Sequence, residues 1–181
     1  SVDANGNVYA AGSTLSTLNI ATNGSHQAGY AGLGDAYVVK FNSSGVRLWG
    51  SYFGGNGTET VYGIDATAAN SVAVAGTTTS TSSIATAGAF QTVHGGGTYD
   101  GLLFKFNAVG TRIWSTYVGG TSADFMYDIA VNSSALIAVG GSTSGSPGLA
   151  SSGAHQTAFG GGGSDGVVWT FNTAGNRIWA S

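Results

Sequence analysis

The chain repeats itself with a period of 65 residues, and this period constrains its fold more than any other feature. The set Asp35, Asp100 and Asp165 shows the step most plainly. Three further sets keep it: Trp49, Trp114 and Trp179; Asn42, Asn107 and Asn172; Gly45, Gly110 and Gly175. A fixed period means that one structural unit packs against copies of itself, because a single unit cannot bury its own apolar faces. A residue present in every copy is therefore expected to build the unit rather than one active site.

Within the central copy, the residue pattern predicts four short strands. An apolar run at 71–76 indicates a strand buried on both faces, and residues 100–107 alternate as a strand does. The sequence Asn-Ala-Val-Gly at 107–110 predicts a tight turn, because Asn caps its own backbone and Gly accepts a positive φ. The returning strand is predicted at 111–117, and a fourth strand at 125–129.

Four short antiparallel strands per repeat predict an all-β protein made of β-propeller blades. The copies cover approximately residues 1–64, 65–129 and 130–181. The third copy is expected to lack its fourth strand, because Ser181 matches Thr116 of the second copy. About three blades cannot close a ring, since known propellers have roughly four to eight. We therefore expect a segment of a larger propeller, its open edges covered by further blades of the same protein or by a partner chain.

The composition argues against several classes of partner. Only 7% of the residues are charged and the net charge is −3, so nucleic acid is not an expected partner. No apolar run approaches the length of a membrane helix, so membrane insertion is not expected either. The absence of Cys from the sequence excludes a disulfide framework and thiolate chemistry.

The repeated pattern also resembles a known family. In the central copy, residues 88–92 read Gly-Ala-Phe-Gln-Thr, Asp100 precedes a strand, and residues 115–120 read Ser-Thr-Tyr-Val-Gly-Gly. This combination is similar to the SBBP repeat, which is named for a seven-bladed β-propeller, and it covers essentially the whole chain. The resemblance implies an extracellular or cell-surface bacterial protein and supplies no catalytic residues. One departure is Thr170, which stands where the other copies have Lys.

Acidic residues are the first candidates for chemistry. Asp35, Asp100 and Asp165 each lie between a Gly-rich loop and a strand, where a carboxylate accepts backbone N–H groups and fixes the loop. A Ca²⁺ site is the alternative, although one acid per copy is few for a cation that binds six to eight oxygens. Glu59 and Asp124 are also 65 residues apart. A glycosidase would need such a pair roughly 5–10 Å apart; we expect solvated loop acids instead.

Histidines and loop aromatics are the second group of candidates. His26 and His155 occupy one position in two non-adjacent copies, so a shared zinc site is not expected. Tyr30, Phe90 and Phe159 are loop aromatics that would bind a sugar if they lay on one rim. The tryptophans of the repeat are expected to pack between neighbouring blades instead, because every copy has one.

These observations favour a non-enzymatic extracellular scaffold of propeller blades, with an adhesive role, in a larger secreted or cell-surface bacterial protein. Two alternatives stay open. One is a carbohydrate-binding module that uses Tyr30, Phe90 and Phe159 to hold surface glycans. The other is a polysaccharide-active enzyme whose site lies at the propeller axis. No catalytic residue is assigned, and no cofactor is expected beyond the Ca²⁺ considered for Asp35, Asp100 and Asp165.

Overall fold

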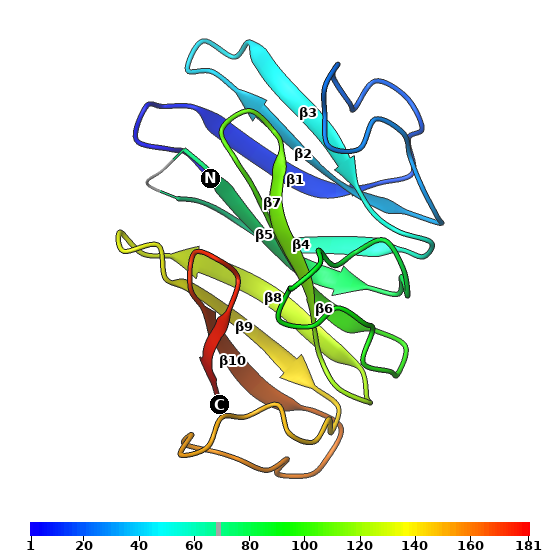
Figure 1. Cartoon of the computed structure of the whole chain (residues 1–181), viewed down its shortest axis with the longest axis vertical. Helices are drawn as coiled ribbons and strands as arrows, with labels where there is room; N and C mark the ends of the chain where they lie inside the picture. Colours follow the sequence, from blue (N-terminus) through cyan, green and yellow to red (C-terminus); the bar gives the residue numbers. More distant parts are fainter. Residues whose placement is uncertain (68–69) are drawn as a thin grey trace.

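The computed structural model describes residues 1–67 and 70–181. These residues form eleven β-strands and no helix, as Figure 1 shows. In this part of the chain no helix is long and apolar enough to cross a membrane. The strands are β1 (Val8–Thr14), β2 (Asp35–Phe41), β3 (Arg47–Phe53), β4 (Glu59–Ala66), β5 (Val72–Thr78), β6 (Asp100–Phe106), β7 (Arg112–Val118), β8 (Asp124–Val131), β9 (Ile137–Thr143), β10 (Asp165–Phe171) and β11 (Arg177–Ala180).

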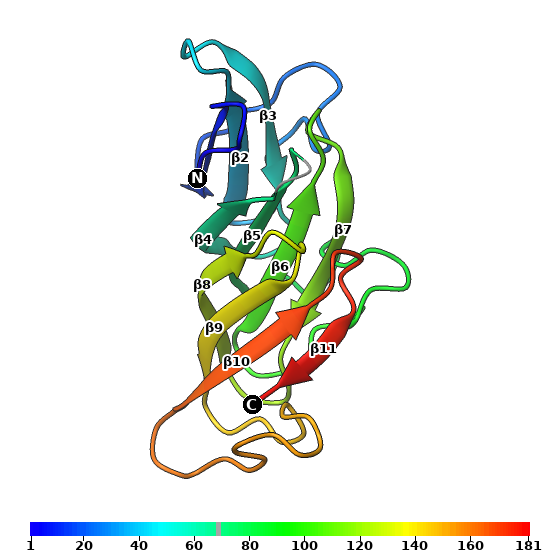
Figure 2. The same ribbon diagram turned by 90° about the vertical axis from the view of Figure 1, so that its left-hand side faces the viewer.

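The strands form three antiparallel sheets that pack side by side. The first sheet has the order β1-β2-β3, the second β4-β5-β6-β7, and the third β8-β9-β10-β11. The sheets follow one another along the long axis of the molecule in Figure 1. In the turned view of Figure 2, β4 and β8 lie at one side, and β7 and β11 lie at the other. The described residues form an all-β structure, as predicted, and their three sheets do not close into a ring.

The assignment of the fourth strand to its own repeat is wrong. The strand predicted around 125–129 is β8, which pairs with the following β9 and not with β7. Likewise β4 pairs with β5, so the three-stranded sheet is the first one and the last sheet has all four strands. The chain leaves each sheet before the fourth strand begins. We call residues 54–58, between β3 and β4, the first connector, and residues 119–123, between β7 and β8, the second connector. Each connector carries the chain from one sheet to the next.

The hairpin turns form as the sequence predicts. In the turn after β2, the side-chain carbonyl of Asn42 accepts the N–H groups of Ser44 and Val46, and Gly45 has a φ of 78°. The turns at 107–110 and 172–175 repeat this geometry, with a φ of 83° at both Gly110 and Gly175. A positive φ is costly for residues with a Cβ, so glycine is required at each turn.

The apolar core lies between the sheets. One cluster joins the first sheet to the second and includes Trp49, Phe53, Phe104 and Phe106. Another joins the second sheet to the third, and Trp114 takes the place there that Trp49 has in the first. Every residue of β5 is buried, which confirms the strand predicted to be covered on both faces. Each sheet thus depends on its neighbour to cover its apolar residues.

Candidate functional site

The three loop aromatics have different neighbours. Tyr30 packs edge-on against Tyr52 of its own repeat, with ring centroids 6.3 Å apart. Phe90 packs against Phe171 of the third sheet at 5.8 Å, so it contributes to the contact between two sheets. Phe159 is 37% exposed and lines a cavity in the third repeat. Its contact with Phe171 therefore gives Phe90 a structural role between two sheets.

The repeated aspartates fix the long loops, as the structural interpretation expects. Oδ2 of Asp35 accepts hydrogen bonds from Gln27 Nε2 (2.7 Å) and from the N–H of Ala31 (2.9 Å). Asp100 accepts the same pair of bonds, from Gln91 and Gly95. At Asp165 the donors are Gln156 and Gly160.

The glutamine in each loop was not singled out from the sequence. Oε1 of Gln27 accepts the N–H of Gly54, and Oε1 of Gln91 accepts the N–H of Gly119. Each of these glutamines therefore ties an aspartate to the glycine that begins a connector. The signal was present in the sequence, because a glutamine follows the Gly-Ser-His, Gly-Ala-Phe and Gly-Ala-His triplets of the three copies.

Glu59 and Asp124 are buried, so the prediction of solvated loop acids is wrong. Both side chains are fully inaccessible to solvent. Glu59 accepts hydrogen bonds from the hydroxyls of Thr78 and Ser80 and from the N–H of Gly55. Asp124 accepts equivalent bonds from Ser146 and Gly120. A buried carboxylate requires such donors, and here they come from a connector and from the end of the next strand and the loop after it.

Each buried acid faces the aspartate that begins the strand two before its own, so Glu59 of β4 faces Asp35 of β2. A side chain at position 54 would place its Cβ 2.5 Å from both Asp35 Oδ1 and Glu59 Oε2. At position 119 the corresponding distances to Asp100 Oδ1 and Asp124 Oδ2 are 2.9 and 2.8 Å. The glycines are therefore required, because they separate two carboxylates with no room for a side chain.

Burial raises the pKa of three of these carboxyl groups, Asp35, Glu59 and Asp100. For Glu59 the charge of Asp35 adds to the effect, and for Asp100 the charge of Asp124 does. Burial also raises the pKa of Tyr117 to about 12, with further contributions from Glu59 and Asp100. A raised carboxyl pKa means that ionisation of the group weakens the folded state, so these acids favour stability at low pH.

The surroundings of the acids do not suit a calcium ion. N–H and O–H donors point at Oδ2 of Asp35 and Asp100 and at Glu59, and Gly54 and Gly119 lie against the oxygens of each pair. Ca²⁺ prefers six to eight oxygen ligands, which this donor set does not supply. Among the residues that the structure describes, no three His, Cys, Asp or Glu side chains come together to hold a metal ion.

One contact between the sheets is made twice, between a tryptophan and the hairpin turn of the next repeat. Trp49 Nε1 donates to the carbonyl of Ala108 at 2.9 Å, and Trp114 Nε1 donates to Thr173 at the same distance. A Cβ at Gly110 would lie 2.8 Å from the ring of Trp49, and one at Gly175 would lie 2.7 Å from Trp114. The ring thus covers a glycine where a side chain would clash. We call this arrangement the tryptophan–turn contact.

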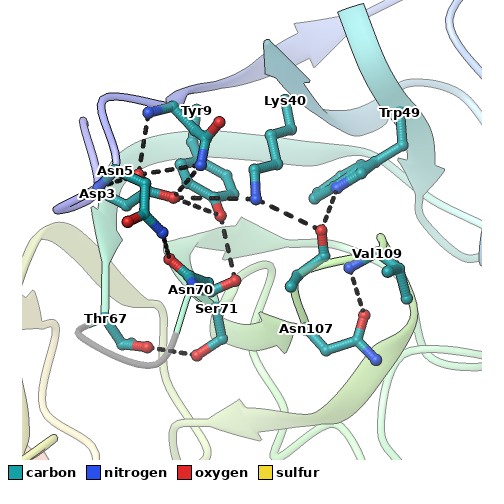
Figure 3. Close-up of polar contacts among 12 residues, drawn as sticks. Asp3, Asn5, Tyr9, Lys40, Trp49, Thr67, Asn70, Ser71, Asn107 and Val109 are labelled. Atoms are coloured by element: carbon teal, nitrogen blue, oxygen red, sulfur yellow. Dashed lines mark hydrogen bonds and ion pairs between the residues drawn. The ribbon is translucent and has the colours of Figure 1, made fainter. Parts of the chain in front are cut away.

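A lysine on the neighbouring strand supports each tryptophan–turn contact. Lys40 lies opposite Trp49 in the β2–β3 ladder, and its Nζ is 3.5 Å from the Ala108 carbonyl. Figure 3 shows this ammonium group between that carbonyl and Asp3, whose Oδ2 is 3.8 Å away. Lys105 contacts Thr173 in the same way, with Nζ 2.7 Å from its hydroxyl.

Asp3 is held by more than its lysine. Its carboxylate accepts hydrogen bonds from Asn7 and Asn5, and the hydroxyl of Tyr9 lies 3.2 Å from it (Figure 3). Burial acts to raise the pKa of Asp3, but the bonds from Asn7 and Asn5 outweigh it and hold the pKa below its usual value. The group therefore serves as an ionised partner for Lys40 within the contact between the first two sheets.

His26 packs in the contact between the first and second sheets. Its ring lies 5.6 Å from that of Phe106 and 6.1 Å from that of Phe53. Burial, together with the positive charge of Arg112, lowers its pKa to about 4. The matching residue in the second repeat is Phe90, which contacts Phe171 as His26 contacts Phe106.

We expect His26→Phe to make the protein less sensitive to acid. In the unfolded chain the imidazole of His26 binds a proton below about pH 6.5. In the folded protein it binds one only near pH 4. His26 therefore costs stability as the pH falls through this range, by about 1 kcal/mol after solvent screening at a half-buried site. Asp35, Glu59 and Asp100 contribute with the opposite sign in both proteins. Urea unfolding from pH 7 to pH 4 measures the difference, and parallel curves for wild type and variant would contradict the prediction.

A cavity lies in the third repeat. It has a volume of about 240 Å³ and is lined by Leu149, Gln156, Phe159, Asp165 and Val167, among others. In the first two repeats, Tyr52 packs on Tyr30 and Tyr117 packs on His94.

A scan against protein-family models found no match for this chain, and a search of curated proteins found no significantly similar sequence.

Proposed function

We propose that the chain is a non-enzymatic scaffold, a set of β-propeller blades that belongs to a larger secreted or cell-surface bacterial protein. The observation that carries the proposal is the repeated tryptophan–turn contact, made by Trp49 and again by Trp114. Repeats that join through one recurring contact build an extended structure with a continuous surface, as a scaffold requires. The resemblance to the SBBP repeat supports the same assignment and the extracellular location.

The use of the polar side chains also supports a scaffold. Asp35 and Asp100 hold loops, and Glu59 and Asp124 hold connectors, where solvent does not reach them. Hydrolysis of a glycoside needs two carboxyl groups that both reach the bond to be broken. Buried acids that accept hydrogen bonds from backbone N–H groups and hydroxyls hold the surrounding loops in place instead.

The experiment that tests this proposal is a search for ligands and activity with the folded chain. A glycan array and a screen of soluble polysaccharides for hydrolysis are both expected to give no signal. Reproducible binding that is lost in Tyr30→Ala or Phe159→Ala would favour the carbohydrate-binding module instead. Hydrolysis of any polysaccharide would contradict the non-enzymatic assignment.

A further inference from the structure

We propose that one proton is shared between the two carboxyl groups at each connector, Asp35 with Glu59 and Asp100 with Asp124. We call these the first and the second carboxyl pair. Alkaline solution would remove the shared proton and loosen the connector. The inference goes beyond the scaffold proposed above and does not depend on it. Each pair lies inside the molecule and joins two described sheets, the first to the second and the second to the third.

In each pair, an oxygen of the aspartate faces an oxygen of the second acid across the first glycine of a connector. A Cβ on that glycine would lie 2.5 Å from both Asp35 Oδ1 and Glu59 Oε2. In the second pair it would lie 2.9 Å from Asp100 Oδ1 and 2.8 Å from Asp124 Oδ2. The facing oxygens are therefore within about 6 Å of each other, and all four side chains are fully buried. Two negative charges so close in a buried site repel each other strongly, so one carboxyl group of each pair keeps a proton.

The facing oxygen of each aspartate has no other partner. Among the described residues, neither Asp35 Oδ1 nor Asp100 Oδ1 takes part in a hydrogen bond. The second oxygen of each aspartate already accepts the loop bonds from a glutamine and a backbone N–H. A buried oxygen without a partner is costly. A shared proton supplies the partner, because the O–H of one carboxyl group then donates to the carboxylate of the other.

No cation balances two negative charges in either pair. In the part of the chain that the structure describes, no lysine or arginine forms an ion pair with these four acids. His94 Nδ1 lies 3.8 Å from Asp100 Oδ1, but it accepts the N–H of Gly96 and so has no proton to donate. The connectors and residues 79–83 and 144–148, which supply the other donors, contain no titratable side chain.

Tyrosines are the remaining titratable neighbours of the pairs. Tyr117 of β7 lies near Glu59 and Asp100, and burial and these two charges raise its pKa to about 12. In the first repeat Tyr30 takes the place of His94, against Tyr52. Tyrosine hydroxyls bring no positive charge at any pH. A proton on the carboxyl groups themselves is therefore the means of neutralising each pair.

The retained protons make the folded state sensitive to alkali. Burial raises the pKa of Asp35, Glu59 and Asp100, so the folded chain keeps protons that the unfolded chain loses above about pH 4. Folding then binds protons, and the folding equilibrium constant falls by up to about tenfold per pH unit for each retained proton. The fall ends where the pair itself ionises. Two ionised acids would push the connector away from the long loop, at the joint between neighbouring sheets.

Infrared spectroscopy in deuterated water tests the proposal, because the C=O stretch of a protonated carboxyl group is separate from the carboxylate bands. Folded wild type at neutral pH is expected to show this band and to lose it in alkaline solution. Glu59→Gln and Asp124→Asn each replace one acid by an amide of nearly the same shape. Each should lower the band by about half, and the double variant should abolish it. Asp128→Asn is the matched control, since Asp128 is exposed on the same strand as Asp124, and it should leave the band unchanged.

Urea unfolding between pH 7 and pH 9 gives a second readout. Wild type and Asp128→Asn are expected to lose stability as the pH rises, whereas Glu59→Gln and Asp124→Asn should lose less, and the double variant least. Circular dichroism confirms that each variant is folded, and the wild-type band decides if one is not. Absence of a protonated carboxyl band from folded wild type at neutral pH would overturn the proposal. So would a band and a pH dependence that neither variant changes.

Discussion

Replacing Trp114 with alanine is expected to lower the free energy of unfolding by about 3–5 kcal/mol, the range for large aromatic residues in a core. Trp114 is 6% exposed, lies over Gly175 and donates a hydrogen bond to the carbonyl of Thr173. Its loss would leave a cavity between the second and third sheets. Urea unfolding, followed by circular dichroism at low protein concentration, measures the effect.

Trp179→Ala is the matched control for this prediction. The residue type and its position in the repeat are the same, but Trp179 is 44% exposed. We expect this variant to lose about 1 kcal/mol or less in the monomer. Equal losses in the two variants would mean that the contact with the next turn contributes nothing to stability.

A second large effect is expected for Gly110→Ala. The substitution forces a side chain into a conformation with a φ of 83° and places a Cβ 2.8 Å from the ring of Trp49. The positive φ costs about 1–2 kcal/mol, and crowding a packed contact costs about 1–3 kcal/mol more. Thermal and urea unfolding should both show the loss.

Gly45→Ala separates these two costs. Gly45 lies in the same turn of the first repeat with a φ of 78°, and no described atom lies near its would-be Cβ. In this variant the free energy of unfolding should fall only by the cost of the backbone conformation, about 1–2 kcal/mol. If Gly110→Ala were no less stable than Gly45→Ala, the ring of Trp49 would not be packed on the turn as described.

Much of the local structure could be predicted from the sequence because it depends on local chemistry. The Asn-x-x-Gly turns follow from one side chain that caps its own backbone and one glycine at positive φ. The strand at 71–76 follows from its apolar residues. The burial of Trp49 and Trp114 follows from the period itself, since a repeated tryptophan packs against the next copy.

The remaining features depend on contacts between distant residues. Strand patterns do not say which neighbours pair, so the sequence pattern predicts the wrong sheets for β4 and β8. In the sequence, Glu59 and Asp124 look like surface acids because nothing near them marks their hydrogen-bond donors. These donors are N–H groups of a glycine-rich connector and serine hydroxyls more than twenty residues away. Phe90 looks like a loop aromatic, and only the fold brings it to Phe171.

Exchange of the indole N–H protons in deuterated water tests the central claim most directly. The claim is that one tryptophan–turn contact joins each sheet to the next and is left open at the third. In a ¹H–¹⁵N spectrum at low protein concentration, the indole signals of Trp49 and Trp114 should exchange slowly, since both protons are buried in hydrogen bonds. The signal of Trp179 should exchange fast. Rapid exchange at Trp49 and Trp114, or equal protection at all three, would contradict the account.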